Sequence, residues 1–132
     1  MYPNLRNTLL TAAIALAAFG ALTWRNSANA SGASAPVVVI ALAKVKPGGE
    51  AAFHTAVGKI LTPTRREDGN LSYVYHQAED STVEFAFVEQ WRDDGSIAAH
   101  MQSPHMQQFF KKVGSLFEPG FPQIKKYHTI EK

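Results

Sequence analysis

The spacing of hydrophobic residues changes from that of a strand to that of a helix within the first part of the chain. Residues 37–45 are β-branched and apolar on both faces, a pattern typical of a strand buried on two sides. From Glu50 onwards the pattern predicts an amphipathic helix. Its apolar stripe consists of Phe53, Ala56, Val57, Ile60, Leu61 and Thr64. Pro63 lies in the last turns, where we expect it to kink or end the helix.

Alternating apolar and polar residues predict two further strands, over residues 71–77 and 83–91. The segment Asp68-Gly69-Asn70 before the first of them is a turn signal, in which Gly69 can adopt a positive φ. Polar residues 79–81 form the turn of the resulting hairpin. One face of the second strand carries Glu89 in a row of large apolar side chains, which is unusual for an acid.

Helical periodicity returns in the last third of the chain. Residues 93–95 offer helix caps before a short helical piece at 96–101, and Ser103 is expected to cap a second helix that begins at Pro104. The apolar stripe of that helix consists of Met106, Phe109, Phe110, Val113, Leu116 and Phe117. Pro119-Gly120 is expected to end it, and residues 123–130 form a final strand.

The predicted order of elements is β-α-β-β-α-β, which is that of the ferredoxin-like α+β fold. In this fold both helices cover one face of a four-stranded sheet. The residues on the other face are here too apolar to remain in water, so we expect two copies to stack their sheets. The pattern therefore predicts a homodimer that associates through its sheet faces.

Residues 1–30 have the layout of a secretory signal peptide. Arg6 precedes an apolar run over residues 8–22, Ala28-Asn29-Ala30 is a small-x-small cleavage site, and no acidic residue occurs before Glu50. We therefore expect a secreted or periplasmic protein that is cleaved after Ala30. The alternative is an uncleaved membrane anchor. Residues 31–36 are then a flexible lead-in, and residues 37–130 form the folded domain.

Removal of this leader changes the charge of the protein. The whole chain has 13 basic and 11 acidic residues, and the leader contains two of the basic ones, Arg6 and Arg25. The mature domain is therefore neutral, which argues against binding to nucleic acid. Without the leader we also expect no association with a membrane. The chain contains no cysteine, so a disulfide cannot stabilise the fold.

The segment Glu89-Gln90-Trp91, followed by His100 and by Ser103-Pro104-His105-Met106, resembles the antibiotic biosynthesis monooxygenase (ABM) family. Lys46-Pro47-Gly48 and the helix-to-strand junction from Pro63 to Tyr73 are similar to the family as well. The resemblance implies a dimeric α+β barrel, and its motifs are nearest to those of quinol monooxygenases that use no cofactor. It does not extend to the haem-degrading branch. The first strand lacks that branch's Asn, His100 stands at the place of its Trp, and Phe110 stands near its haem ligand.

Oxygenation without a cofactor needs a base that removes a proton from the substrate. Histidine has a suitable pKa for this role. His105 lies in the first turn of its helix, where the positive helix end should keep the ring neutral. The resemblance and this position together indicate His105 and His100 as catalytic candidates. The structural alternative is that His105 bonds a local carbonyl and that His100 fixes the bend before Ser103.

The same resemblance implies a small aromatic substrate, quinol-like or anthrone-like, that reacts with O2. We expect it to be bound by Trp91, Tyr73, Tyr75, Glu89, Phe87, His54 and Phe109. A carboxylate placed among aromatic residues must be paired or must have a raised pKa. For Glu89 we expect an ion pair with Arg65, Arg66 or Arg92 rather than a role in orienting a histidine.

A metal site is not expected from the sequence. Only His100 and His105 lie close together, their spacing is wrong for one helical face, and a proline separates them. The resemblance likewise implies an enzyme that has no cofactor. Two other functions remain open, a non-catalytic small-molecule-binding or stress-related module and an acid/base isomerase, because a fold does not determine function.

Overall fold

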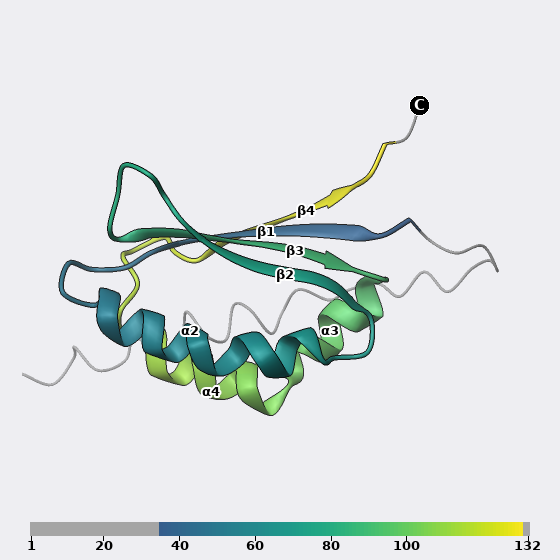
Figure 1. Cartoon of the computed structure of the whole chain (residues 1–132), viewed down its shortest axis with the longest axis horizontal. Coiled ribbons are helices and arrows are strands. Elements are labelled where there is room, and N and C mark those ends of the chain that lie inside the picture. Colours follow the sequence, from purple (N-terminus) through teal and green to yellow (C-terminus); the bar gives the residue numbers. More distant parts are fainter. Residues whose placement is uncertain (1–34, 131–132) are drawn as a thin grey trace, which may run out of the picture. The chain divides into compact units, whose positions relative to one another are not determined.

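The computed structural model describes residues 35–130 of the chain, so the predicted leader and most of the lead-in lie outside the described residues. The described chain forms four strands and three helices (Figure 1). In order, they are β1 (Val37–Lys44), α2 (Glu50–Arg65), β2 (Asn70–Gln77), β3 (Glu84–Trp91), α3 (Asp94–Gln102), α4 (Pro104–Val113) and β4 (Gln123–His128). Within residues 35–130, no helix combines the length and apolar character that a membrane span requires.

The strands form one antiparallel sheet in the order β2-β3-β1-β4, and all three helices lie on the same side of it (Figure 1). This is the ferredoxin-like arrangement, and the fold class predicted from the sequence is confirmed. The second helical region is divided into α3 and α4, because Ser103 has an extended backbone between them. The division places the C-terminal end of α3 and the N-terminal end of α4 next to each other.

The hydrophobic core lies between the helices and the sheet. Every second residue of β1 and β3 points to the helices, including Val39, Ala41, Phe85, Phe87 and Trp91, and all of these are buried. Phe53 of α2 stands at the centre, and its ring lies within 6.5 Å of four other Phe rings. Glu89 belongs to the same buried row.

Several predicted boundaries are confirmed. Gly69 has φ +88° at the turn into β2. The Asp93 side chain accepts a hydrogen bond from the Ser96 amide at the start of α3, and the Ser103 hydroxyl accepts one from the Met106 amide at the start of α4. Pro63 does not end α2, which continues to Arg65.

The end of α4 differs from the prediction, since the helix stops at Val113 and does not include Leu116 and Phe117. Phe117 instead forms a β-bridge with Val45, and the Leu116 carbonyl accepts a hydrogen bond from the Lys46 amide at 2.8 Å. These bonds with the end of β1 satisfy backbone groups that the helix would otherwise use. The final strand is also shorter than predicted, since β4 ends at His128.

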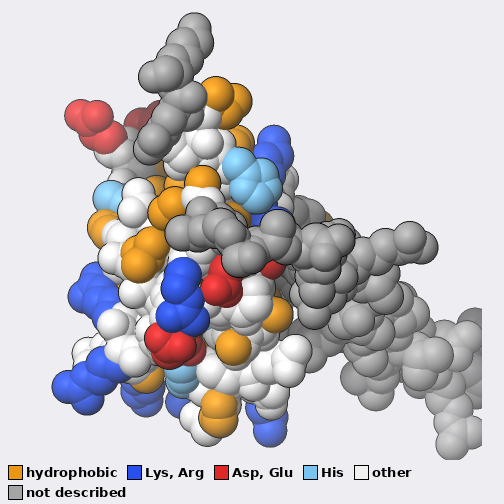
Figure 2. All heavy atoms as spheres, turned by 90° about the vertical axis from the view of Figure 1, so that its right-hand side faces the viewer, with side chains coloured by type: hydrophobic (Ala, Val, Ile, Leu, Met, Phe, Trp, Pro, Cys, Tyr) orange, Lys and Arg blue, Asp and Glu red, His pale blue; other side chains and the backbone are white. Residues whose placement is uncertain are grey.

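The face of the sheet away from the helices carries a row of apolar side chains. Val74, Val88 and Ile40 are register partners across β2, β3 and β1, and Leu42 and Tyr127 are 43% and 45% exposed. Dimer formation through this face stays a prediction. On the end of the domain seen in Figure 2, some acidic and basic side chains lie next to one another, and separate hydrophobic side chains are scattered over the same face.

Candidate functional site

A narrow, mostly apolar pocket lies between the sheet and helices α3 and α4. The cavity itself measures about 40 Å³, and the space around it that no atom occupies, about 410 Å³, is partly open to solvent, so an aromatic ligand would have to displace side chains of the pocket. Strand residues, helix residues and the segment before β4 form its wall. They are Ala41, Leu42, Ala43, Tyr73, Phe87, Glu89, His100, Met101, Met106, Phe109, Phe110, Phe117, Pro122 and Ile124. Three polar side chains, those of Tyr73, Glu89 and His100, therefore meet an otherwise apolar space.

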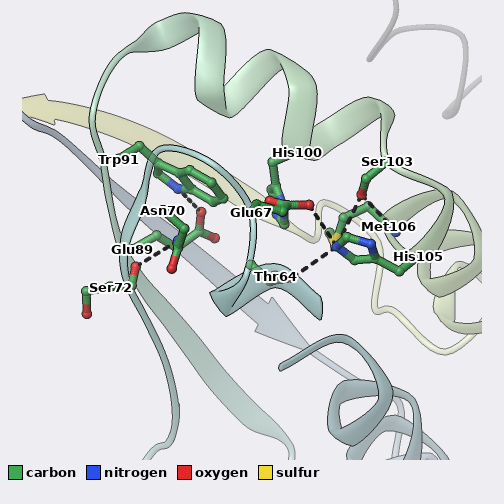
Figure 3. Close-up of polar contacts among 10 residues, drawn as sticks. All are labelled: Thr64, Glu67, Asn70, Ser72, Glu89, Trp91, His100, Ser103, His105 and Met106. Carbon is green, nitrogen blue, oxygen red and sulfur yellow. Dashed lines mark hydrogen bonds and ion pairs between the residues drawn. The ribbon is translucent and has the colours of Figure 1, made fainter. Parts of the chain in front are cut away.

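Glu89 is held by a hydrogen bond from the indole of Trp91. The Trp91 Nε1–H donates to Glu89 Oε2 at 2.7 Å, and both side chains are buried (Figure 3). The expected ion pair with an arginine is wrong. Arg92 binds Asp68 and Asp93, and the Arg65 Nε–H donates to the Tyr73 carbonyl. Among residues 35–130, Glu89 thus forms an ion pair with none of Arg65, Arg66 and Arg92, and the indole of the same strand supplies the short bond that it accepts.

Burial changes the acidity of the polar groups in the pocket. It raises the pKa of Glu89 from 4.5 to about 7; the bond from Trp91 opposes this rise, and the charge of Glu67 adds to it. Near neutral pH the Glu89 carboxyl is thus close to half protonated. Burial, together with the charges of Glu89 and Glu67, also raises the pKa of Tyr73. The Tyr73 hydroxyl consequently keeps its proton and can donate it in a hydrogen bond to a ligand.

Glu67 joins the two histidines that the sequence indicated. It lies in the turn after α2, and its Oε2 is 2.7 Å from His100 Nδ1, while its Oε1 is 2.9 Å from His105 Nε2 (Figure 3). The second pair is close but is not aligned as a hydrogen bond, so Glu67 Oε1 is buried and accepts no hydrogen bond from the described residues. The hydroxyls of Thr64 and Ser103 lie 3.3 and 3.2 Å from the same nitrogen of His105.

Burial also determines the charge state of this cluster. It lowers the pKa of His100 to about 4, with a smaller contribution from His105, and it lowers the pKa of His105. Burial raises the pKa of Glu67, and the Ser103 hydroxyl partly offsets this effect. The short contact with Glu67 favours a neutral His100 whose proton is on Nδ1, directed at the carboxylate. The Nε2 atom, which has no hydrogen-bond partner within residues 35–130, is then a proton acceptor.

His100 is the member of this cluster that reaches the pocket. Its side chain is 2% exposed, and its ring lies 4.7 Å from that of Trp91 and 5.6 Å from that of Tyr73. It lines both the apolar pocket and an open groove on the other side, which Glu67 and Ser103 also line. His105 is not among the residues that line the pocket, and it lies beyond Glu67.

The remaining predicted residues fall into two groups. Tyr73, Phe87, Glu89 and Phe109 line the pocket, whereas Trp91 supports Glu89 and His100 from outside it. Tyr75 and His54 do not line it: the Tyr75 hydroxyl lies 3.2 Å from His54 Nδ1 near the exposed surface of α2 and β2.

Glu67 is the residue that reasoning from the sequence missed as a member of the site. It lies 33 residues before His100 and on another element, so no spacing rule connects the two. A signal was nevertheless present, because Glu67 belongs to the helix-to-strand junction on which part of the family resemblance rests. The turn at Gly69 directs the chain back toward β2 and leaves Glu67 beside the ends of α3 and α4 (Figure 3).

Comparisons with known proteins agree with this architecture. The sequence model of the antibiotic biosynthesis monooxygenase family matches residues 36–112. An uncharacterised protein of Synechocystis sp. is 32% identical over 104 residues, covering 78% of this chain and 69% of the relative. The "Putative monooxygenase" Rv0793 of Mycobacterium tuberculosis is 32% identical over 83 residues, covering 63% of this chain and 81% of the relative.

Solved structures give the same picture. The crystal structure of PA3566 from Pseudomonas aeruginosa superposes with a TM-score of 0.71 at 27% identity, covering 76% of this chain and 100% of that chain. The structure of Rv0793 has a TM-score of 0.68 at 28% identity, covering 74% of this chain and 97% of that chain. The similarity thus spans the whole domain that holds the pocket and the Glu67 cluster.

Proposed function

Because this chain belongs to the antibiotic biosynthesis monooxygenase family, we propose that it oxygenates a small quinol-like or anthrone-like aromatic with O2 and without a cofactor. The observation that carries the proposal is the position of His100. One ring nitrogen faces the Glu67 carboxylate at 2.7 Å, and the ring itself lines the apolar pocket together with Glu89 and Tyr73. A base and two groups that can donate hydrogen bonds, Glu89 in its protonated form, thereby meet in one mostly apolar pocket.

In the proposed reaction, His100 Nε2 removes a proton from an acidic O–H or C–H group of the substrate. The resulting anion passes one electron to O2, and the substrate radical and superoxide combine to form a C–O bond. For an activated methylene the peroxide then breaks its O–O bond, so that the products are a carbonyl compound and water. All four electrons that reduce O2 come from the two C–H bonds of the substrate methylene, so no other reductant is needed. His100 Nε2 takes the first proton, the second is lost as the O–O bond breaks, and both end in the water.

The other polar groups stabilise the charge that develops on the substrate. Tyr73 keeps its proton and can donate a hydrogen bond to the substrate oxygen, and Glu89 can do the same in its protonated form. Glu67 holds His100 in the tautomer that accepts a proton on Nε2. Phe87, Phe109 and Met106 provide the apolar wall that a flat aromatic ring requires. His105 was the first candidate for the base, but its place behind Glu67 supports a positioning role.

The test is O2 uptake by the metal-stripped full-length protein with a panel of hydroquinones and anthrones. A positioned base contributes about 10²–10⁴-fold, so His100→Ala should lower kcat at least 100-fold. His105→Ala should have a smaller effect, and His128→Ala, at an exposed position of β4, should have none. Uptake that equals the autoxidation blank, with ligand binding intact, would refute the proposal and favour a binding module. Turnover without O2 would favour an isomerase.

We infer further that the protein acts as a homodimer outside the cytoplasm. The apolar row of Val74, Val88 and Ile40 on the open face of the sheet supports the dimer, because water-exposed apolar rows of this kind are usually covered. The composition of residues 1–30 supports export, with cleavage after Ala30. N-terminal sequencing of the protein recovered from a periplasmic fraction would test the cleavage, since an intact Met1 there would contradict it.

A further inference from the structure

A carboxylate and two imidazoles from three separate elements converge at one end of the helical layer. Glu67 comes from the turn after α2, His100 from α3 and His105 from α4 (Figure 3). One ligand atom from each residue can be chosen so that all three lie within 4.8 Å of one another. The spacing of the two histidines alone does not predict a metal site, and the structure adds Glu67 as a third ligand.

We propose that Glu67, His100 and His105 bind one divalent transition-metal ion of the zinc class. Two histidines and one carboxylate are a ligand set that Zn²⁺ uses in sites with an open fourth position. Metal–ligand bonds of about 2.0–2.1 Å place the ligand atoms of a tetrahedral site roughly 3.3 Å apart. The short contacts join different oxygens of Glu67, 2.7 Å from Oε2 to His100 and 2.9 Å from Oε1 to His105. The oxygen that binds the ion must therefore move slightly away from its own imidazole, and the widest pair of ligand atoms must contract from at most 4.8 Å. Rotations of the side chains provide movements of this size.

The unsatisfied oxygen of Glu67 is an independent observation that points to a cation. Glu67 Oε1 is buried and accepts no hydrogen bond of ordinary geometry within residues 35–130, although His105 Nε2 lies only 2.9 Å away. A buried acceptor that has no hydrogen-bond partner destabilises the folded state. A metal ion between this oxygen and the imidazoles would satisfy it, whereas the present protons do not.

An ion has a route to this position from solvent. The open groove next to the cluster is lined mostly by polar side chains, among them those of Glu67, His100 and Ser103. The carboxylates of Asp68 and Asp93 stand at the same groove, where both bind Arg92. The open coordination position would be filled by water from the groove, which separates this site from the apolar pocket on the other side of His100.

Metal binding is tested without substrate, so that its outcome does not depend on the oxygenation chemistry. Untagged full-length protein is stripped with a chelator and titrated with Co²⁺, whose visible absorption reports a site of low coordination number. Zn²⁺ is then added as a competitor. We expect one Co²⁺ per chain, displaced by Zn²⁺, and a rise in Tm with Zn²⁺ concentration.

The ligands are then replaced one at a time. Changes to outer partners of a metal ligand already cost 10–100-fold in affinity, so Glu67→Gln and His105→Gln should each weaken Co²⁺ binding at least about tenfold. His54→Gln and Glu79→Gln, at exposed positions outside the cluster, should leave it unchanged. His105 is 21% exposed, so its replacement keeps the test valid if Glu67→Gln fails to fold. Absence of a saturable Co²⁺ spectrum, or equal affinity in both ligand variants and the controls, would overturn the proposal.

Discussion

The buried carboxylate of Glu89 predicts that Glu89→Gln alters the pH dependence of folding stability. Its pKa is raised from 4.5 to about 7, mainly by burial. The folded protein therefore binds a proton at Glu89 more tightly than the unfolded chain does. The stability that this proton provides is fully present below pH 4.5 and is lost as the pH rises through 7. Gln is nearly the same size, keeps an acceptor for the Trp91 N–H, and does not titrate.

The expected size of the effect follows from the displacement of the pKa. At 1.36 kcal/mol per pKa unit, the change from 4.5 to about 7 corresponds to about 3 kcal/mol. Little screening applies, since Glu89 is only 6% exposed. In the wild-type protein the effect of Glu89 on the free energy of unfolding is masked by the opposite effect of His100. Burial lowers the pKa of His100 to about 4, and this histidine destabilises the fold as the pH falls from 6.5. The two effects have opposite signs over nearly the same pH range.

The difference in unfolding free energy between the wild type and Glu89→Gln contains the contribution of Glu89 without that of His100. Urea unfolding at fixed protein concentration, between pH 5 and pH 8, gives the free energy of unfolding of each variant. As the pH rises from 5 to 8, the free energy of unfolding of Glu89→Gln should increase by about 2–3 kcal/mol relative to that of the wild type. Glu79→Gln, in the exposed turn between β2 and β3, should follow the wild type at every pH. A constant difference between Glu89→Gln and the wild type would show that Glu89 has an ordinary pKa, and our account of the pocket would be wrong.

Two further predictions concern the turn that positions Glu67 and the open face of the sheet. Gly69→Ala places a Cβ 2.6 Å from Ser96 Cβ at a φ of +88°, whereas Gly48→Ala has nearly the same strained φ and no atom within 4 Å. In urea unfolding, Gly48→Ala should lose about 1 kcal/mol of unfolding free energy, and Gly69→Ala should lose at least 1–2 kcal/mol more. Equal losses in the two variants would contradict the clash with Ser96. Light scattering should give twice the chain mass for the wild type and one chain mass for Val88→Arg. The control Thr55→Arg, at an exposed position of α2, should keep the mass of the wild type. An unchanged mass in Val88→Arg would contradict association through this face.

The sequence was sufficient for the elements and their order because hydrophobic periodicity, caps and turn residues agree with one another. The positive φ of Gly69 and the helix cap of Ser103 depend only on residues a few positions away. Local rules therefore predicted both, and both are confirmed. The end of α4 depends instead on a pairing between Phe117 and Val45, which are 72 positions apart. Helical periodicity through Leu116 and Phe117 does not contain this information, and tertiary hydrogen bonds decided the result.

The site was predictable only in part, for a similar reason. The aromatic row around Glu89 is a property of one strand, so its burial was evident before the structure, whereas a raised pKa was one of two alternatives and the ion pair was preferred to it. The hydrogen-bond partner of Glu89 was not evident from the sequence. It is Trp91, on the same strand face, and not one of the expected arginines. The relation between Glu67 and the histidines depends on where three chain segments end relative to one another. Residue types alone do not determine such a position.

The two proposed uses of Glu67 exclude one another at any moment, because both involve Nδ1 of His100. While Glu67 accepts the Nδ1 proton, Nε2 carries a lone pair and can act as the base that we propose for His100, whose ring lines the pocket. A metal ion on Nδ1 takes the place of that proton, and a neutral ring then carries its hydrogen on Nε2, where it is a donor. The cluster would therefore make His100 a base when it holds protons and a hydrogen-bond donor when it holds metal. Oxygenation by the metal-stripped protein and metal binding by the same three side chains are compatible only as alternative states of one site.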